Sequence, residues 1–344
     1  MPGTEVAAAC DAAARAESVP ADVIPVSDGG DGLLDACVVA KLVSHVTSHT
    51  VSGPTGKPLR ARIGWLDNHT ALIESSEAIG LRLLSAGERD PLKTDTGGLG
   101  ELISAALEEG ATSMLVGVGG SSTMDGGLGM ARSWGWLGLD RSGRRLEPGG
   151  GELARMASVK FGWHPACRIA GLVDVTNPLL GSNGARAYAR QKGARAAEED
   201  RLVRGLENLV AATAAVGGAE VGERTGAGAG GGLGFGLMMF AGATLVSGAD
   251  WMLHAVHLEE RLRGVSGVIT AEGAFDETSG SGKLTGRVIE VARQRGLPVG
   301  LLAPRVSAKL DGVVIETGGG TWDRAMLESR ARALIRRMHR LPPS

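Results

Sequence analysis

The stretch SMLVGVGGSSTMDGG, residues 113–127, joins an apolar run to a polar, glycine-rich segment. The apolar half is typical of a short buried strand, and residues 96–110 before it predict a helix. A helix that feeds a buried strand is an α/β unit. Gly119 and Gly120 let backbone N–H groups converge on an anion, and Ser121 and Ser122 add hydroxyl donors. A glycine-rich connector without function is the alternative interpretation.

Similar units recur along the chain. Apolar runs that end in polar loops occur in CRIAGLVDVTNP (167–178), in GVSGVITAEGAFD (264–276) and, after a helix expected around 288–295, in LPVGLLAP (297–304). Near the N-terminus, VIPV at 23–26 predicts a strand that enters the turn SDGGDG. Because ligands bind at the carboxyl ends of strands in open α/β sheets, these loops are candidates for a site.

A different pattern occupies residues 42–73. The segments HVTSHTVSG, PLRARIGWL and HTALIES have period-two character and are linked by short turn sequences, which predicts antiparallel hairpins. This block and the long central section after it predict a second, mixed α/β domain inserted into an α/β domain. We expect a discontinuous outer domain, residues 1–45 plus 241–344, and an inserted domain, residues 46–240.

Composition argues against several classes of protein. The 344 residues include 55 glycines without a Gly-X-Y period, and a formal net charge of −2 does not suggest a basic face for nucleic acid. No apolar run approaches the roughly 20 residues of a membrane span. Three distant cysteines predict a reducing, cytoplasmic location. The N-terminal residues lack the pattern of a signal peptide and predict a helix.

The segment GAGAGGGLG, residues 226–234, is the second dense run of glycines. Gly226, Gly228 and Gly231 match the spacing GxGxxG, but no convincing strand precedes them, so an NAD-type oxidoreductase stays a weak alternative. We expect instead that the backbone at Gly228, Gly230 and Gly231 approaches a ligand closely, with tight packing as the other interpretation.

Lys283 lies in SGSGKLT, residues 279–285. This segment departs from a Walker A loop at the first glycine and at the final hydroxyl. The chain has seven lysines against 29 arginines, and Lys283 stands in a glycine loop. Contact with a phosphate is the functional interpretation, and a solvated lysine is the alternative.

Acidic residues gather where strands are expected to end, at Asp28, Asp31, Asp174, Glu272 and Asp276, and Asp125 follows the first glycine loop. Each alone is commonly a turn former or a helix cap. Carboxylates beside anion-binding glycines can also hold Mg²⁺ or take a proton from a hydroxyl. Their combination predicts phosphoryl transfer, which needs acids for the metal and N–H or positive groups for the phosphates.

The motifs in chain order are SDGGDG (27–32), IESSEAIGL (73–81), ERDPLKTDTGGLGELI (88–103), GVGGSSTMDGG (117–127), LVDVTNPLLGSNGA (172–185), QKGA (191–194), GAGAGGGLGFGL (226–237) and ITAEGAFD (269–276) with Gly282-Lys283. Together they resemble the class I glycerate kinase family over nearly the whole chain. The resemblance implies ATP- and Mg²⁺-dependent transfer of phosphate to D-glycerate, usually to its 2-hydroxyl. It also implies a flavodoxin-like parallel-sheet domain interrupted by a second mixed α/β domain.

We expect ATP to lie against backbone and hydroxyl groups of the glycine loops, namely Gly119, Gly120, Ser121, Ser122, Gly228, Gly230 and Gly231. Lys283 would contact its phosphates, and Glu272 with Asp276 would hold Mg²⁺. Asp174 or Asp276 would orient or deprotonate the acceptor hydroxyl; both choices stay open.

The substrate carboxylate needs a cation, for which Arg89 and Lys93 are the candidates, and we expect Asp28 and Asp125 to contact the substrate as well. The expected partner is glycerate or a similar small hydroxy acid, not nucleic acid or a membrane, and a homodimer is left open.

The chain departs from the family pattern in several places. Family members begin with a strand and an Asp-Ser-Phe-Lys-Gly stretch, whereas this sequence begins at the helix that follows them. Asp90-Pro91-Leu92 replaces Asn-Pro-Leu, and Ala271-Glu272-Gly273 replaces Gly-Glu-Gly. The alternative is therefore a catalytically weak or inactive ligand-binding or regulatory member of the same fold.

Overall fold

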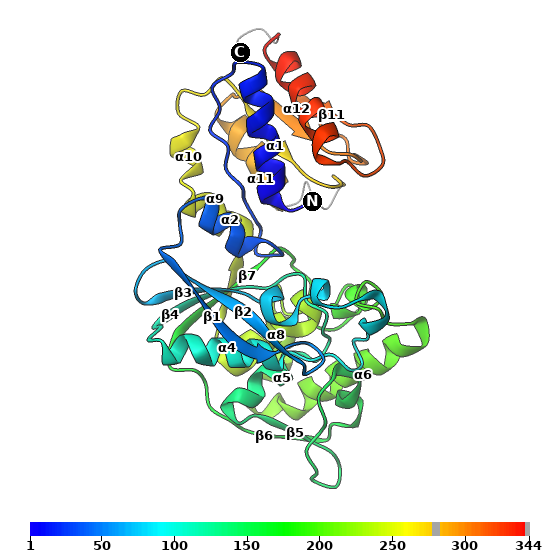
Figure 1. The fold of residues 1–344 in the computed structure, drawn as a ribbon. Helices are drawn as coiled ribbons and strands as arrows, with labels where there is room; N and C mark the ends of the chain where they lie inside the picture. The colour runs from blue at the N-terminus through cyan, green and yellow to red at the C-terminus, as the bar shows by residue number, and fades with distance from the viewer. Residues whose placement is uncertain (277–282, 341–344) are drawn as a thin grey trace. The chain divides into compact units, whose positions relative to one another are not determined.

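The computed structural model describes residues 1–276 and 283–340, which divide into two compact units (Figure 1). The smaller unit comprises residues 1–28, 35–42 and 249–344, and the larger unit comprises residues 29–34 and 43–248. The division falls within helix α2 (Leu33–Val39). Helices and strands alternate in both units, so the fold is mixed α/β with mostly parallel sheets, as predicted.

The larger unit is built on a six-stranded sheet in the order β1-β2-β3-β4-β7-β8. The strands are β1 (His45–Ser52), β2 (Pro58–Trp65), β3 (Thr70–Glu74), β4 (Ser113–Gly117), β7 (Arg168–Val173) and β8 (Thr244–Ser247). The first three pair antiparallel, as the period-two pattern predicted, and β3, β4, β7 and β8 pair parallel. A separate two-stranded sheet joins β5 (Leu137–Leu139) and β6 (Ser158–Lys160).

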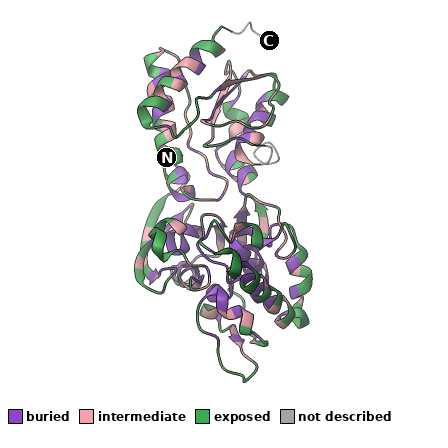
Figure 2. Cartoon of the chain, turned by 90° about the vertical axis from the view of Figure 1, so that its right-hand side faces the viewer, coloured by how far each residue is buried: buried purple, intermediate pink, exposed green. Residues whose placement is uncertain are grey.

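The helices of the larger unit pack against its strands and against one another. They are α3 (Ser76–Ile79), α4 (Gly97–Glu108), α5 (Leu128–Ala131), α6 (Ala196–Ala212), α7 (Gly218–Glu223) and α8 (Ala229–Ala241). Helix α4 carries a buried face of Leu99, Leu102 and Ile103, which pack into the core with Ile63 and Ile73 of the strands. Figure 2 shows buried segments gathered inside the unit.

The smaller unit has a three-stranded parallel sheet in the order β11-β10-β9. Its strands are β9 (Val268–Ala271), β10 (Val299–Leu302) and β11 (Val313–Glu316), and its helices are α1 (Gly3–Ala16), α9 (Gly248–Ala255), α10 (Leu258–Arg261), α11 (Leu284–Gln294) and α12 (Arg324–Met338). Ala9 and Ala13 of α1 pack against Leu334 of α12 and Leu302 of β10. The small alanine face lets the two helices and the sheet share one core.

The expected strand at 23–26 is wrong, because residues 21–27 form no strand in the structure. Pro25 has no backbone N–H to give to a neighbouring strand, which confines proline to sheet edges or loops. A short apolar run is compatible with a strand only where a partner strand lies beside it, and this information is not local.

Candidate functional site

The parallel strands of the larger unit end at one edge of its sheet. In the register of these strands Glu74 of β3 lies opposite Gly117 of β4, Gly117 lies opposite Leu172 of β7, and Val173 lies opposite Ser247 of β8. The segments that follow these strands therefore begin side by side. They include the predicted loop Gly119–Ser122 and the predicted residue Asp174, so this edge is the candidate site of the larger unit.

The loop Gly119–Ser121 has its carbonyl groups fixed by the protein. The carbonyl of Gly119 accepts a hydrogen bond from the Ser75 hydroxyl (3.3 Å), and that of Gly120 accepts one from the backbone N–H of Leu81 (2.7 Å). The carbonyl of Ser121 accepts one from Lys192 Nζ. Among the described residues, the backbone N–H groups of Gly119, Gly120 and Ser121 have no acceptor. Three consecutive donors of this kind suit an anion.

Glycine is required in this loop for two different reasons. Gly120 has φ 63°, in the left-handed region, and a Cβ there would come 2.1 Å from Asp31 Oδ1. A Cβ at Gly119 would lie 2.4 Å from the Cα of Gly30. Gly30 and Asp31 of the SDGGDG segment thus pack against the loop, and neither Gly119 nor Gly120 has room for a side chain.

The two serine hydroxyls of the loop are already engaged. Ser121 Oγ donates to the carbonyl of Gly230 (2.8 Å), and Ser122 Oγ donates to the carbonyl of Ile79 (3.0 Å). Their predicted use as donors to a phosphate is therefore not what this structure shows, and the remaining donors are backbone N–H groups. Thr123 Oγ1 is buried and has no hydrogen-bond partner among the described residues.

Lys192 is a site residue that the sequence reasoning missed. Its side chain is 6% exposed, and Nζ donates to both the carbonyl and, at 2.7 Å, the hydroxyl of Ser121. Burial lowers its pKa from 10.5 to about 7, while the charge of Asp125 acts in the opposite direction. The sequence signal that could have pointed to Lys192 was the motif QKGA in a chain with few lysines. This motif alone does not indicate that the lysine is buried.

The glycine run at 226–232 forms a turn at the start of α8. Gly230, Gly231 and Gly232 all have positive φ, between 61° and 91°, and a Cβ at Gly231 would lie 2.0 Å from the carbonyl oxygen of Thr123. Helix α7, not a strand, precedes this run. The strand–loop–helix context that a dinucleotide fingerprint needs is thus missing, which removes the support for the oxidoreductase alternative.

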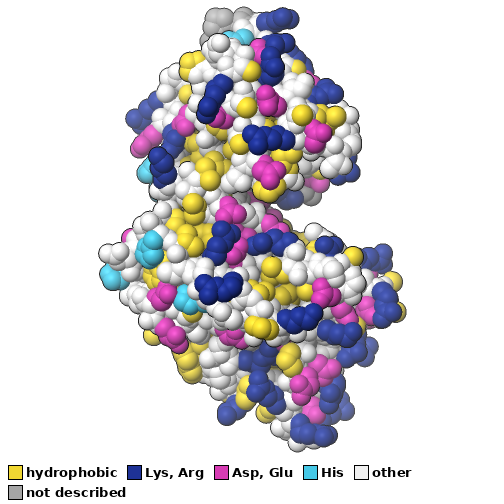
Figure 3. Space-filling view, viewed as in Figure 1, with side chains coloured by type: hydrophobic (Ala, Val, Ile, Leu, Met, Phe, Trp, Pro, Cys, Tyr) yellow, Lys and Arg dark blue, Asp and Glu magenta, His cyan; other side chains and the backbone are white. Residues whose placement is uncertain are grey.

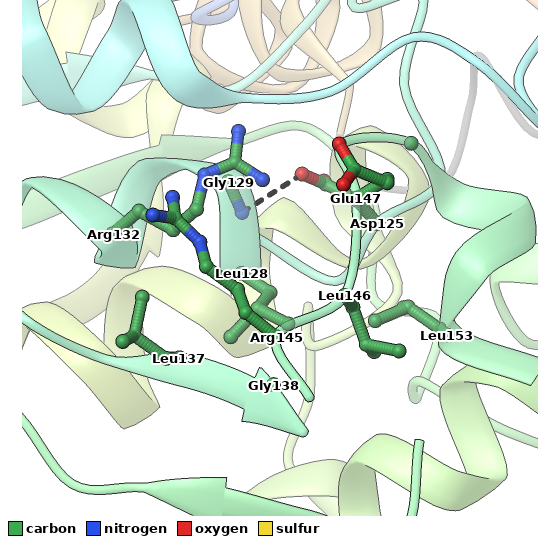
Figure 4. A pocket seen from close by; sticks show the side chains of 11 residues that line it. Asp125, Leu128, Gly129, Arg132, Leu137, Gly138, Arg145, Leu146, Glu147 and Leu153 are labelled. Atoms are coloured by element: carbon green, nitrogen blue, oxygen red, sulfur yellow. Dashed lines mark hydrogen bonds between the residues drawn. The ribbon is translucent and has the colours of Figure 1, made fainter. Parts of the chain in front are cut away.

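Asp125 lies in the interior and is used by the protein itself. Its Oδ2 accepts hydrogen bonds from the backbone N–H of Thr96 (2.9 Å), from the Thr96 hydroxyl (2.8 Å) and from the backbone N–H of Gly129 (3.0 Å). Burial, with the charge of Asp95, raises its pKa. Figure 4 shows Asp125 at the wall of a pocket that Arg132, Arg145 and Glu147 also line.

Two glutamates, the last residue of β3 and a residue of α3, were also missed as individual residues. Glu74 is 2% exposed and accepts hydrogen bonds from the backbone N–H groups of Gly32 and Leu34, both 3.0 Å away. Glu77 accepts from Arg62 and from Arg82. Burial alone would raise the pKa of Glu77, but the two guanidinium groups outweigh it and the pKa is lowered. These carboxylates hold the rim of the site rather than a ligand.

The other predicted residues of the larger unit lie at its surface. Asp174 follows β7 and is exposed, and its charge, after burial, contributes to the raised pKa of Tyr188. Arg89 is exposed, and its backbone packs against Gly193 beside Lys192. Lys93 Nζ pairs with Asp90 at 3.0 Å. Of the two cations, Arg89 is the one without an ion pair among the described residues.

Four predicted residues belong to the smaller unit: Asp28, Glu272, Asp276 and Lys283. Glu272 and Asp276 follow β9, and the backbone N–H of Glu272 donates to the carbonyl of Leu302 (3.0 Å). Lys283 is the residue before the first turn of α11, and residues 277–282 of its glycine loop lie outside the described residues. Across the described ranges, no group of three or more His, Cys, Asp or Glu side chains could hold a metal ion.

Surface charge is mixed. Figure 3 shows acidic side chains interspersed among the basic ones on the visible face, in keeping with the net charge of −2. Within residues 1–276 and 283–340, no helix has the length and apolar character that crossing a membrane requires.

Comparison with known proteins gives consistent matches. The model of the glycerate kinase family matches residues 1–321. A "Glycerate 2-kinase" of Escherichia coli (strain K12) is 40% identical over 80% of this chain and 74% of its own length. A "Glycerate kinase" of Bacillus subtilis (strain 168) is 38% identical over 83% of this chain and 76% of its own length. A crystal structure that carries the name glycerate kinase 2, from Salmonella typhimurium LT2, superimposes with a TM-score of 0.78 at 34% identity, covering 98% of this chain and 92% of that one.

Proposed function

The chain belongs to the glycerate kinase family, and from this premise we propose that it transfers a phosphoryl group from ATP to the 2-hydroxyl of D-glycerate. The observation that carries the proposal is the loop Gly119–Ser121, whose carbonyls are all anchored and whose N–H groups have no acceptor among the described residues. Such a loop is ready to bind a phosphate without rearrangement, which is what phosphoryl transfer requires.

In the larger unit, the N–H groups of Gly119, Gly120 and Ser121 hold phosphate oxygens of ATP. The acceptor hydroxyl oxygen attacks the γ-phosphorus, the bond from that phosphorus to the β,γ-bridging oxygen breaks, and the hydroxyl proton passes to a carboxylate. Asp174 supports this role by its exposed position at the carboxyl end of β7. Asp276 of the smaller unit is the other candidate for the base.

In the smaller unit, Glu272 and Asp276 supply oxygen atoms of the kind that Mg²⁺ binds. Two carboxylates fit this ion, because Mg²⁺ in kinases is commonly held by one or two carboxylates together with phosphate oxygens and water. Bound there, Mg²⁺ would neutralise charge that develops on the phosphates. Lys283 carries a positive charge of the kind that binds phosphates.

The glycerate carboxylate is bound by Arg89. Its guanidinium is exposed and has no ion pair among the described residues, whereas Lys93 is paired with Asp90. A planar guanidinium can also make two parallel hydrogen bonds to a carboxylate, which an ammonium cannot.

The proposal is tested by ³¹P and ¹H NMR of the product formed from ATP, Mg²⁺ and D-glycerate. We expect 2-phosphoglycerate from the native chain. Arg89→Leu should raise the KM for glycerate at least tenfold with the KM for ATP unchanged, while Lys93→Met serves as the matched control and changes neither. A product phosphorylated at the 3-hydroxyl would contradict the regiochemistry, and an unchanged KM in Arg89→Leu would contradict the role of Arg89.

A further inference from the structure

All seven lysines lie among the described residues, and Lys192 is the one that is buried. It follows the short 3₁₀ helix Ala185–Tyr188 in the segment Gln191–Ala194. A buried ammonium is unfavourable unless acceptors surround it. An apolar side chain of similar size would fill the same space without the free-energy cost of removing a charge from water. Packing alone therefore gives no reason for a lysine here.

The acceptors of Lys192 connect three segments that are far apart in the chain. Nζ donates to the carbonyl and the hydroxyl of Ser121, 71 residues away. The hydroxyl of Ser121 in turn donates to the carbonyl of Gly230, which is 109 residues from Ser121 in the chain. One side chain thus ties the loop Gly119–Ser121 to the turn Gly228–Gly232.

The hydrogen of the Ser121 hydroxyl has its direction set by this arrangement. Because the ammonium can only donate, Ser121 Oγ accepts from Lys192 and must donate elsewhere, and Gly230 supplies that acceptor. The ammonium also holds the Ser121 carbonyl, the last of three anchored carbonyls in the loop. Removing it would release the end of the loop on which the unpaired N–H groups lie.

A neighbouring carboxylate partly offsets the unfavourable burial of the Lys192 charge. Asp125 is buried, and its field favours the ammonium form of Lys192. Asp95, whose charge acts on Asp125, forms an ion pair with Arg132. The ammonium therefore lies near a buried carboxylate but does not form an ion pair with it among the described contacts, and its direct hydrogen bonds go to Ser121.

We propose that Lys192 is a positioning residue for phosphoryl transfer, which acts through Ser121 to hold the loop Gly119–Ser121 and the turn Gly228–Gly232 in the geometry that binds the phosphates of ATP. The inference rests on the proposed function. Lys192 itself is buried and touches no substrate. Its contribution is to keep the three loop N–H groups preorganised, so that no rearrangement is needed as charge develops in the transition state.

The test compares four forms of the full chain: native, Lys192→Met, Ser121→Ala and the double variant. Methionine has an unbranched side chain like that of lysine, shorter by the terminal nitrogen, and therefore has no donor. We expect Lys192→Met to lower kcat by about 10- to 100-fold, with the KM for glycerate within twofold of native and no fall in melting temperature. Lys160→Met is the matched control, because Lys160 is an exposed lysine on β6, and it should retain native kinetics.

The double variant separates a positioning role from general damage. If Lys192 acts through Ser121, Ser121→Ala should lower kcat by about 3- to 10-fold alone and add almost nothing to Lys192→Met. Effects that multiply would overturn the proposal, as would a folded Lys192→Met with kcat within twofold of native. If Lys192→Met does not fold, native kinetics in Ser121→Ala would overturn it.

Failure of the proposed function would be recognised independently, because the native chain would then consume no ATP in the presence of glycerate. In that case the inference is tested by titration calorimetry with ATP. We expect at least a fivefold higher Kd for Lys192→Met than for the native chain, and an unchanged Kd would overturn the inference.

Discussion

Asp125 Oδ2 accepts both the backbone N–H and the side-chain hydroxyl of Thr96, at 2.9 and 2.8 Å. The same oxygen accepts the N–H of Gly129 at the start of α5. This buried carboxylate therefore joins the first turns of α4 and α5, where backbone N–H groups would otherwise lack acceptors. Its exposure is 2%, so the carboxylate faces protein and not solvent.

Asp125→Ala should destabilise the protein by about 2–4 kcal/mol, because it leaves several buried donors unpaired. Urea unfolding followed by circular dichroism measures the change. Asp200→Ala, which removes only an exposed pair with Arg186, should stay within about 0.5 kcal/mol of native. Equal stability of the two variants would contradict the structural role of Asp125.

The Gly120→Ala variant tests the phosphate loop. Gly120 has φ 63°, and a Cβ would approach Asp31 Oδ1 to 2.1 Å, so alanine must distort the loop. We expect kcat/KM for ATP to fall at least tenfold. Gly143→Ala is the matched control: Gly143 has φ 78° with open space around its Cβ position, so it carries the same kind of backbone strain away from the loop. Loss of activity in both variants would point to strain alone.

Glu17 supports a stability prediction for the smaller unit. Its carboxylate accepts hydrogen bonds from Arg336 and Arg332 of α12, and these bonds lower its pKa from 4.5 to about 2. The stabilisation is present above pH 4.5 and is lost as the pH falls toward 2. Glu17→Gln should therefore melt at a lower temperature than native at pH 7, with the difference shrinking between pH 4.5 and 2. Glu108→Gln, an exposed change of the same chemistry on α4, is the control measured at each pH.

The buried ammonium of Lys192 predicts the opposite slope. Its folded pKa of about 7 lies below the ordinary value of 10.5, so between these values the unfolded chain binds the extra proton and stability rises with pH. For one titrating group, the unfolding free energy can rise by at most about 1.4 kcal/mol per pH unit. Lys192→Met has no buried charge, so at pH 6.5 its unfolding free energy should exceed that of the native chain. This difference should narrow from pH 6.5 to pH 9.5, because the native lysine loses its charge over that range. A gap that is independent of pH would show that the ammonium is not desolvated.

Local patterns were sufficient for much of the fold. The period-two segments became β1, β2 and β3, and the amphipathic run before the first glycine loop became α4. The run VIPV at 23–26 failed because a strand depends on a partner, and Pro25 can donate no hydrogen bond to one. Element type follows from neighbours in sequence, whereas membership of a sheet follows from neighbours in space.

In the candidate site, too, some features follow from the local sequence and others depend on contacts between distant residues. Gly119 and Asp174 were predicted correctly to follow strands, because apolar runs that end in polar loops are visible in sequence. The engagement of the Ser121 hydroxyl by Gly230 and the burial of Lys192 depend on contacts over 109 and 71 residues. A hydroxyl in a glycine loop looks the same in sequence whether it faces a ligand or a carbonyl.

The most direct test of the account is ADP release from ATP and Mg²⁺ by the purified chain, with D-glycerate, with L-glycerate and without acceptor. We expect ADP only with D-glycerate, and we expect its release to fall by orders of magnitude in Lys283→Ala with a nearly unchanged melting temperature. A folded chain that gains melting temperature with ATP but releases no ADP with D-glycerate would contradict the account.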